Sequence, residues 1–344
     1  MKTYKQNPDF LYLGGKLLAW YEINGRDLPF RKTRNPYFIW ICEIIFQQTR
    51  ISQGLDHYHR FVQRFPDVKS LADSDQDEVL LYWKGLGYYS RAINLHKAAR
   101  QIVDEFNGVF PKDHRDILKL KGVGKYTAAA VVSICYGEKI PAVDGNFYRV
   151  LSRVFADDFD TASPKAFSYF SELALRMMPD ENPGSFNEAV MDLGSEVCKP
   201  RNPECGICPL QQDCLAFALG KTADFPVKSR KVKVSALELN YYFVHHQKEF
   251  LIRRRGDDFI WKNLYDFPDA VPPEWLHADT PVTTIKHKLT HRNLTIYIHD
   301  IELDDVIDFQ NFATMEGFST ATLESSHRKS FPKPLENYLQ QVFI

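Results

Sequence analysis

The sequence predicts a multidomain α+β protein, with an all-helical N-terminal region followed by a smaller α/β region. Apolar residues recur at helical spacing through the first two thirds of the chain, as in PYFIWICEIIFQQTRI, SRAINLHKAARQIVDEF and KYTAAAVVSICYG. After about Pro226 the pattern changes to short β-rich runs, among them NYYFVHH, EFLIRRR and NLTIYIHDIEL. In the last run Leu294, Ile296 and Ile298 occupy alternate positions, which predicts a strand with one buried face.

The segment FPVKSRKVKVSA, between these two regions, is polar and basic and is typical of an interdomain linker. We therefore expect a helical domain at residues 1–225, a basic linker at 226–233 and a second domain at 234–344. A composition of 44% hydrophobic and 25% charged residues over 344 positions is sufficient to bury a core in each domain. The N-terminal residues carry charges and no long apolar run, so we expect no signal peptide, no membrane span and a cytoplasmic location.

The overall charge does not indicate a partner. A net charge of −1 and a pI of 6.8 give no general attraction to nucleic acid. Basic residues are clustered in KSRKVK and IKHKLTHR, where they form either a local nucleic-acid contact or an ordinary solvated surface.

Two short motifs in the helical region are weak signals by themselves. In LKGVGKYTAAAVV, Gly122 and Gly124 predict a tight turn between two helices. Such a turn lets backbone N–H groups approach a phosphate at the positive end of the second helix, although glycines join helices in many folds. In IPAVDGNFYRVLSR, Asp144 precedes Gly145 and Asn146, a pattern that usually marks a turn or a helix cap.

The stretch CKPRNPECGICPLQQDC holds four of the six cysteines, with six, two and then five residues between successive thiols. Four thiolates in one short loop, Cys198, Cys205, Cys208 and Cys214, can bind either a zinc ion or a [4Fe–4S] cluster. Zinc sites usually separate two close cysteine pairs by a longer stretch, so this spacing favours the cluster. The other two cysteines lie in apolar sequence and are expected in the core.

The order of the hairpin, the DGN turn and the cysteine loop resembles that of the endonuclease III superfamily of DNA glycosylases. Within that superfamily, PYFIWICEIIFQQTRI resembles the MutY-type adenine DNA glycosylases, which have a glutamate just before QQT. The resemblance covers roughly residues 10 to 220, and the C-terminal domain matches more loosely. It implies a helix-hairpin-helix glycosylase domain that includes an iron–sulfur cluster loop at 198–214, followed by a Nudix-like lesion-recognition domain.

Two carboxylates suggest two separate roles in breaking an N-glycosidic bond, a general acid and a stabiliser of positive charge. Glu43 has apolar neighbours on a predicted helix, and burial would raise its pKa, as a general acid toward adenine requires. Asp144, if it stays ionised, can stabilise the oxocarbenium-like sugar. The resemblance agrees with both roles and adds Tyr126 near the sugar and Asn146 beside the aspartate.

The resemblance also assigns residues to DNA and to the flipped base. It places Arg31 and Glu188 around the extruded adenine. It places Gln48, Thr49, Leu86 and Tyr88 around the lesion pair, although Tyr88 alone could equally be a core residue. The hairpin residues Gly122, Gly124 and Lys125 are expected to contact phosphate.

One position separates this sequence from the bifunctional relatives, whose hairpin carries an attacking lysine. Tyr126 occupies that place here, and Lys125 lies one residue earlier, which on a helix rotates its side chain by about 100°. The sequence therefore predicts a monofunctional glycosylase with weak strand cleavage, and Lys125 as a phosphate contact.

The C-terminal domain lacks the glutamate-rich box of a Nudix hydrolase, so we expect it to recognise a lesion and not to catalyse. Family members have FSH on the strand that meets the oxidised guanine. The best match here is Leu289, Thr290 and His291, which keeps the hydroxyl and the imidazole but lacks the aromatic ring.

The function predicted is excision of adenine opposite 8-oxoguanine or guanine in double-stranded DNA, by a monomeric base excision repair enzyme. Two alternatives are a superfamily glycosylase with another target, such as thymine opposite guanine, and a non-enzymatic iron–sulfur DNA-binding protein. A pair of placed carboxylates argues against the non-enzymatic alternative. Glu43 together with the C-terminal domain argues against another base target.

Overall fold

The computed structural model describes residues 9–229, 234–256 and 259–342. The chain forms two compact units, one of residues 1–73 with 94–231 and the other of residues 74–93 with 232–344. The second unit thus includes a segment, 74–93, that the predicted boundaries assign to the helical domain. Of the predicted linker, residues 230–233 lie outside the described residues.

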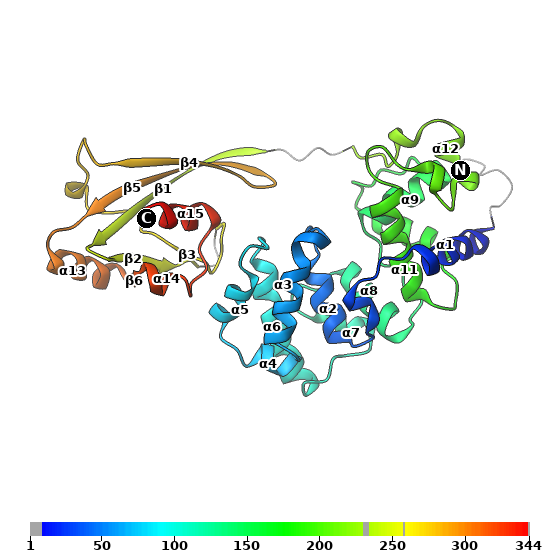
Figure 1. Cartoon of the computed structure of the whole chain (residues 1–344), viewed down its shortest axis with the longest axis horizontal. Helices are drawn as coiled ribbons and strands as arrows, with labels where there is room; N and C mark the ends of the chain where they lie inside the picture. Colours follow the sequence, from blue (N-terminus) through cyan, green and yellow to red (C-terminus); the bar gives the residue numbers. More distant parts are fainter. Residues whose placement is uncertain (1–8, 230–233, 257–258, 343–344) are drawn as a thin grey trace. The chain divides into compact units, whose positions relative to one another are not determined.

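The first unit is helical, as predicted, and Figure 1 shows α2 beside α8. Its α-helices are α1 (Phe10–Asn24), α2 (Pro36–Ile45), α3 (Ile51–Arg64), α4 (Val68–Ala72), α7 (His114–Lys119), α8 (Lys125–Tyr136), α9 (Gly145–Phe155), α10 (Ala166–Met177), α11 (Pro183–Asp192) and α12 (Leu215–Ala218). A π-helical turn at Leu193–Val197 continues α11, and short 3₁₀ turns lie at Pro29–Lys32, Cys205–Ile207, Gln211–Asp213 and Thr222–Asp224. Helix α6 (Ser90–Phe106) runs across the boundary between the two units.

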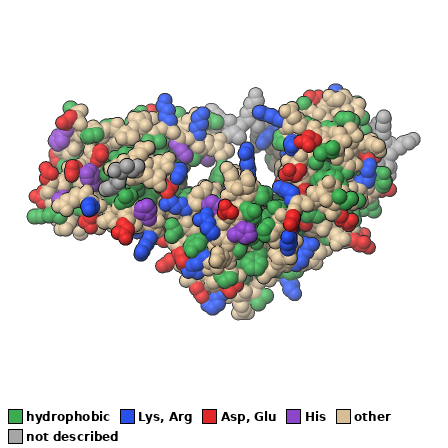
Figure 2. All heavy atoms as spheres, in the orientation of Figure 1, with side chains coloured by type: hydrophobic (Ala, Val, Ile, Leu, Met, Phe, Trp, Pro, Cys, Tyr) green, Lys and Arg blue, Asp and Glu red, His purple; other side chains and the backbone are tan. Residues whose placement is uncertain are grey.

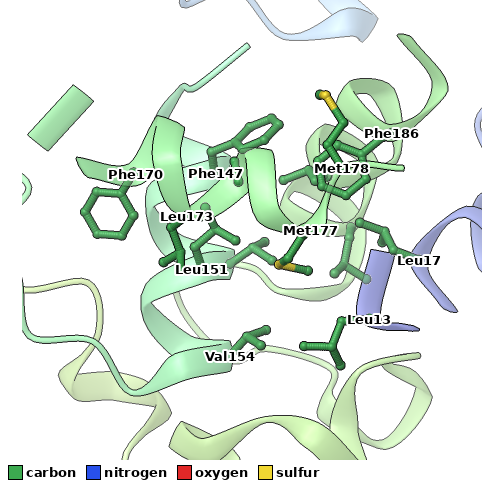
Figure 3. Close-up of a cluster of buried hydrophobic side chains, with 14 of the residues drawn as sticks. Leu13, Leu17, Phe147, Leu151, Val154, Phe170, Leu173, Met177, Met178 and Phe186 are labelled. Atoms are coloured by element: carbon green, nitrogen blue, oxygen red, sulfur yellow. The ribbon is translucent and has the colours of Figure 1, made fainter. Parts of the chain in front are cut away.

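One core of the first unit lies among α1, α9, α10 and α11. Figure 3 shows Leu13 and Leu17 of α1 together with Phe147, Leu151 and Val154 of α9 in one apolar cluster. Phe147, Leu151 and Leu17 are completely buried, which removes large apolar areas from water. This packing fixes α9, which Asp144 caps at its N-terminus.

The second unit is built on a mixed six-stranded sheet with the order β3-β2-β1-β5-β4, and β6 also pairs with β2. The strands are β1 (Ser235–His246), β2 (Glu249–Arg254), β3 (Tyr265–Asp266), β4 (Val282–Lys288), β5 (Arg292–Glu302) and β6 (Ser319–Thr322). Its helices are α5 (Gln76–Trp83), α13 (Val306–Glu316), α14 (Leu323–Ser326) and α15 (Lys333–Val342), with a 3₁₀ turn at Pro273–Trp275.

Both faces of the sheet are covered. Leu294, Ile296 and Ile298 of β5 are buried, as the alternation predicts, and pack with Leu335 and Tyr338 of α15. The opposite face of the sheet packs against α13. Strands β1 and β5 pair in parallel, and β4 and β5 form an antiparallel hairpin whose turn contains Thr290 and His291.

The surface carries both signs of charge. In Figure 2, Lys and Arg side chains are interspersed with Asp and Glu over the visible face, which agrees with the near-neutral net charge. Over the described part of the chain, the structure contains no helix with the length and hydropathy that a membrane span needs.

Candidate active site

The helical unit contains a cavity of about 1210 Å³, which we call the central cavity. Its walls come from α2 and the turn after it, the α7–α8 turn, the start of α9 and the end of α11. Eleven of the predicted site residues line this one cavity, namely Arg31, Glu43, Gln48, Thr49, Gly122, Gly124, Lys125, Tyr126, Asp144, Asn146 and Glu188.

Glu43 lies on α2 in an apolar environment. The helix begins where the Asn35 side chain accepts a hydrogen bond from the Tyr37 N–H, and Pro36 occupies its first position. Ile44 and Ile45, the next residues, are buried. Burial raises the pKa of Glu43 to about 7, reinforced by the negative charges of Glu188 and Asp144 and opposed by the Tyr126 hydroxyl and Arg31. Its carboxyl is therefore partly protonated near neutral pH.

Tyr126 lies in the first turn of α8 and interacts electrostatically with both Glu43 and Asp144. Its hydroxyl is 3.0 Å from the Met191 sulfur, and it also interacts with the carboxyl of Glu43. Burial and the charges of Glu43 and Asp144 hold the pKa of this phenol well above its ordinary value. Tyr126 is therefore a neutral hydroxyl in the cavity wall.

Asp144 is the N-cap of α9, which confirms the helix-cap interpretation of the DGN turn. Its Oδ1 accepts hydrogen bonds from the backbone N–H groups of Asn146 (2.8 Å) and Phe147 (3.0 Å), and the Asn146 side-chain amide donates to Oδ2 over 2.7 Å. Burial is the largest effect and leaves the pKa of Asp144 above its ordinary value, although these donors and the charge of Arg149 lower it in part. The carboxylate thus faces three hydrogen-bond donors at the positive end of a helix.

Asn146 is in turn held by Arg149, one turn further along α9. Arg149 Nη2 donates to Asn146 Oδ1 over 2.7 Å and to the Gly194 carbonyl over 2.6 Å. A Cβ on Gly194 would lie 2.6 Å from that of Asn146, so only glycine allows this close approach of the π-helical turn.

A network of five charged residues, which the sequence only partly predicted, lies at another wall of the cavity, and its outer member, Glu196, is 3.6 Å from Arg26 Nη1. Arg31 Nε lies 3.7 Å from Glu188 Oε1, and both Arg31 terminal nitrogens contact Asp192 at 2.6 Å. Arg26 also binds Asp192, through Nε at 2.8 Å and Nη2 at 2.5 Å. Sequence reasoning missed Arg26 and Asp192. The available signal was a carboxylate four residues after Glu188, which on a helix occupies the same face.

The predicted hairpin is present as the turn between α7 and α8. Gly122 has φ = +76°, a left-handed conformation that favours glycine. A Cβ there would also lie 2.6 Å from Asn94 Cβ. Gly124 is the N-cap of α8. Lys125 Nζ lies 5.0 Å from the centroid of the Phe167 ring, a cation–π contact between two residues that line the same cavity.

The residues predicted around the lesion pair divide between the two units. Gln48 and Thr49 line the central cavity, and Gln48 has a left-handed backbone with φ = +59°. Leu86 and Tyr88 belong to the second unit, where Leu86 is buried and Tyr88 is exposed with φ = +46°.

In the second unit the structure brings Tyr88 to the turn between β4 and β5. The Tyr88 and Thr290 hydroxyls are 2.5 Å apart. His291 is the next residue of the turn and is exposed. Thr290, predicted to contact the lesion, and Tyr88, which the family resemblance places around the lesion pair, are therefore in contact with each other.

The four predicted thiols of Cys198, Cys205, Cys208 and Cys214 line a single small cavity. The rest of its wall is largely apolar, and burial raises the pKa of Cys208 to about 12, with smaller contributions from the neighbouring thiols. Arg153 Nη1 lies 3.3 Å from Cys198 Sγ and 2.7 Å from the Lys199 carbonyl. Four thiols that line one largely apolar pocket have the donor chemistry of an iron–sulfur site, and these cysteines would hold the cluster.

Comparison with known proteins decides the family. Residues 41–173 match the HhH-GPD superfamily of base excision DNA repair proteins, residues 198–214 match the iron–sulfur binding domain of endonuclease III, and residues 240–341 match the NUDIX domain. The chain is 33% identical to the adenine DNA glycosylase of Buchnera aphidicola subsp. Schizaphis graminum, over 94% of this chain and 96% of that protein. The chain belongs to the adenine DNA glycosylase family.

Other proteins are similar to parts of this chain. The adenine DNA glycosylase of Rattus norvegicus is 40% identical over 58% of this chain and 40% of its own length. A thermostable thymine-DNA glycosylase superposes with a TM-score of 0.57 at 29% identity, covering 61% of this chain and 97% of that one. Endonuclease III in a non-covalent DNA complex superposes with a TM-score of 0.54 at 23% identity over 64% of this chain and 99% of its own, and it supports the fold alone.

These matches confirm the sequence prediction of an HhH-GPD domain, a cluster loop and a Nudix-like domain. This adenine DNA glycosylase family member is a DNA-binding glycosylase of base excision repair, and its residues 198–214 form an iron–sulfur binding domain, consistent with a [4Fe–4S] cluster. The iron–sulfur match decides between the two occupants that the cysteine spacing left open. When bound, the cluster ties the segments of this loop together through thiolate bonds.

Proposed function

We propose that this protein excises adenine paired with 8-oxoguanine or guanine. The observation that carries the proposal is the contrast between two carboxyls on one cavity. The carboxyl of Glu43 has a pKa raised to about 7, chiefly by burial. Burial also raises the pKa of Asp144, but its carboxyl accepts three hydrogen bonds, from the Asn146 and Phe147 N–H groups and the Asn146 amide, which favour its ionised form. Such a pair suits an acid and an electrostatic stabiliser in glycosidic cleavage.

Glu43 is the proposed general acid. Adenine is a poor leaving group as an anion, so a proton must reach its ring as the bond to the sugar breaks. A carboxyl with a pKa of about 7 retains that proton in a substantial fraction of molecules at neutral pH. The base must first be flipped out of the duplex, and a cavity of about 1210 Å³ has room for it.

Asp144 is the proposed stabiliser of the sugar. As the bond to adenine stretches, the sugar gains oxocarbenium character, and a fixed carboxylate close to it lowers the energy of that state. Asn146 and Phe147 hold the carboxylate in place before the reaction starts. Tyr126 contributes a neutral hydroxyl beside it.

Arg31 and Glu188 are proposed to contact the extruded base. Together they offer an N–H donor and carboxylate acceptors, which suit the ring nitrogens and the exocyclic amine of adenine. Both side chains line the central cavity, and each is held by a hydrogen bond within the protein, Arg31 by Asp192 and Glu188 by Tyr21.

The opposite base is proposed to meet Gln48, Thr49, Leu86, Tyr88, Thr290 and His291. The short contact between the Tyr88 and Thr290 hydroxyls supports a shared role for those two residues. Lys286, Lys288 and Arg292 flank the same turn and would contact the DNA backbone. Gly122, Gly124 and Lys125 would do so at the hairpin.

The proposed enzyme is monofunctional. The residue at the position of a lyase nucleophile is Tyr126, which has no amine to form a Schiff base. The Lys125 ammonium group lies over the Phe167 ring. The monomeric state and the cytoplasmic location stay predictions.

One experiment separates the proposal from its alternatives. Duplexes with A, T or U opposite G or 8-oxoguanine are incubated with the protein and then treated with alkali, which cleaves abasic sites. We expect strand breaks only at adenine, with 8-oxoguanine as the preferred partner. Breaks at thymine would favour the other-target alternative, for which the likeness to a thymine-DNA glycosylase is a reason to test. Binding without breaks would indicate a non-enzymatic protein.

A further inference from the structure

The carboxylate of Asp192 lies at the end of α11, outside the groups given a role above. Its side chain is completely buried. It accepts hydrogen bonds from three atoms of Arg26, the backbone N (2.9 Å), Nε (2.8 Å) and Nη2 (2.5 Å), and from Nη1 and Nη2 of Arg31 (2.6 Å each). A carboxylate has about four acceptor sites, so these donors saturate it. Hydrogen bonds and charge from Arg31 and Arg26 outweigh the effect of burial and hold the pKa of Asp192 below its ordinary value.

These contacts leave Arg31 little freedom. Its two terminal nitrogens face Asp192, Nη1 also donates to the Arg26 carbonyl over 3.2 Å, and the guanidinium lies 5.4 Å from the centroid of the Tyr21 ring. Its Nε remains directed toward Glu188, at 3.7 Å. Tyr21 donates its hydroxyl proton to the other oxygen of Glu188 over 3.1 Å. Arg31 thus presents one edge to the central cavity.

We infer that Asp192 is a positioning residue: it holds Arg31 in the orientation that meets the extruded base and keeps the guanidinium charge away from Glu43. The inference deepens the proposed function of the central cavity and rests on it. This region holds two arginines, Arg26 and Arg31, and three carboxylates, Asp192, Glu188 and Glu196. When the Asp192 charge is removed, Arg31 loses its bidentate partner, and Glu188 and Glu43 become the carboxylates that attract it.

The protonation of Glu43 depends on the position of the Arg31 guanidinium charge. The charged and titratable groups that interact with Glu43 in the described part of the chain include Cys42 on α2, Tyr126 and Cys135 on α8, Asp144 at the start of α9, Glu188 on α11 and Arg31. Among them Arg31 is the one cation, and a cation closer to a carboxyl lowers its pKa. If Arg31 is released from Asp192 and moves closer to Glu43, the pKa of Glu43 will therefore be lower, and Glu43 will lose its proton at a lower pH.

The test is the pH profile of single-turnover adenine excision by Asp192→Asn, a substitution that keeps size and removes charge. We expect the alkaline limb, where Glu43 loses its proton, to move down by about one pH unit. The loss of rate should consequently be severalfold larger at pH 8 than at pH 6. A purely structural role would lower the rate by the same factor at every pH.

Asp157→Asn is the matched control. Asp157 is also buried in the helical unit and accepts from the Tyr169 hydroxyl (2.6 Å) and the Phe159 N–H (2.9 Å), but it does not line the central cavity. Its substitution should change thermal stability without moving the limb. A double-mutant cycle adds a second criterion, because Asp192→Asn should have no further effect on the limb in an Arg31→Gln background.

Each outcome bears on the inference. An unmoved limb in Asp192→Asn, or independent effects of Asp192→Asn and Arg31→Gln, would overturn it. If Asp192→Asn does not fold, Arg31→Lys replaces it, since lysine cannot make the bidentate contact and should shift the limb in the same direction. An unmoved limb there would overturn the inference as well. Failure of the wild type to excise adenine would instead refute the proposed function.

Discussion

The side-chain amide of Asn146 donates to Asp144 Oδ2 over 2.7 Å, while its oxygen accepts from Arg149. Asn146 is therefore oriented on both sides, and its amide group has one arrangement that satisfies both neighbours. Arg149 Nε also donates to the Cys198 carbonyl over 2.7 Å. The aspartate in the cavity and the cysteine loop are thus parts of one hydrogen-bonded structure around α9.

Replacing Glu43 with Gln should slow adenine excision by about 100-fold or more, because the acid is lost while the shape of the cavity is kept. The protonated form of Glu43 is present below its pKa of about 7 and is lost as the pH rises through that value. The wild-type rate should therefore fall above pH 7, whereas the residual rate of Glu43→Gln should lack this limb. Single-turnover excision measured from pH 5.5 to 9 checks both statements, and near wild-type rates in the variant would exclude Glu43 as the acid.

Replacing Asp144 with Asn should also slow excision by about 100-fold or more, but for an electrostatic reason. Asparagine is an equally good N-cap, so α9 and the affinity for DNA should be kept. Asp113→Asn is the control, since Asp113 caps α7 in the same way, accepting from the Arg115 N–H over 2.7 Å. Full activity of Asp144→Asn, with normal thermal stability, would contradict the proposed role.

Purified protein should be brown and contain iron and sulfide in near-equal amounts, because four thiolates converge on one pocket. Cys208→Ser should lose iron and reduce folded yield or DNA binding. Cys135→Ser should keep the iron, since Cys135 lies on α8, away from the loop. Metal and sulfide analysis of anaerobically prepared protein is the measurement, and stoichiometric zinc without iron would be the contrary result.

The wild type should form little borohydride-trappable adduct with substrate DNA, since Tyr126 cannot form a Schiff base. Tyr126→Lys should increase trapping, because it places an amine at the position of Tyr126, which interacts with both Glu43 and Asp144. Lys125→Gln should leave the low level unchanged. Efficient trapping by the wild type that disappears in Lys125→Gln would show that the neighbouring lysine reaches the sugar after all.

The elements that the sequence predicted well are those in which local pattern and chemistry agree. Alternation of Leu294, Ile296 and Ile298 predicted a buried strand face, and Asp144 before a glycine predicted a helix cap. Asp192 was missed because its role depends on Arg26 and Arg31, more than 160 positions earlier in the chain. A local sequence pattern cannot predict a contact between residues so far apart in the chain.

The sequence also failed to predict structure in segments whose pattern of polar and apolar residues is mixed. Strand β4, Val282–Lys288, has mostly exposed polar residues and takes its structure from pairing with β5. The grouping of residues 74–93 with the second unit depends on contacts such as that of Tyr265 with Asp77, 188 positions apart. The helical periodicity of residues 74–93 predicts a helix but does not indicate which domain that helix packs against.

Thr290→Ala should reduce the preference for 8-oxoguanine over guanine while leaving excision itself largely intact. The two bases differ mainly at N7 and C8, so discrimination requires a polar group there. The Thr290 hydroxyl is exposed in the β4–β5 turn and is fixed by the Tyr88 hydroxyl. Losing one good hydrogen bond in a dehydrated interface costs about 1 to 3 kcal/mol, or roughly a tenfold to hundredfold change in preference.

Thr284→Ala is the control for that experiment, because Thr284 is an exposed threonine of the adjoining strand and pairs with Tyr297, away from the turn. Tyr88→Phe removes only the hydroxyl that holds Thr290, so it should lower the preference less than Thr290→Ala does. The ratio of excision rates on 8-oxoguanine and guanine duplexes is the quantity to compare among the wild type and the three variants. An unchanged ratio in Thr290→Ala would mean that this hydroxyl does not read the opposite base, and that lesion recognition depends on other groups of the protein.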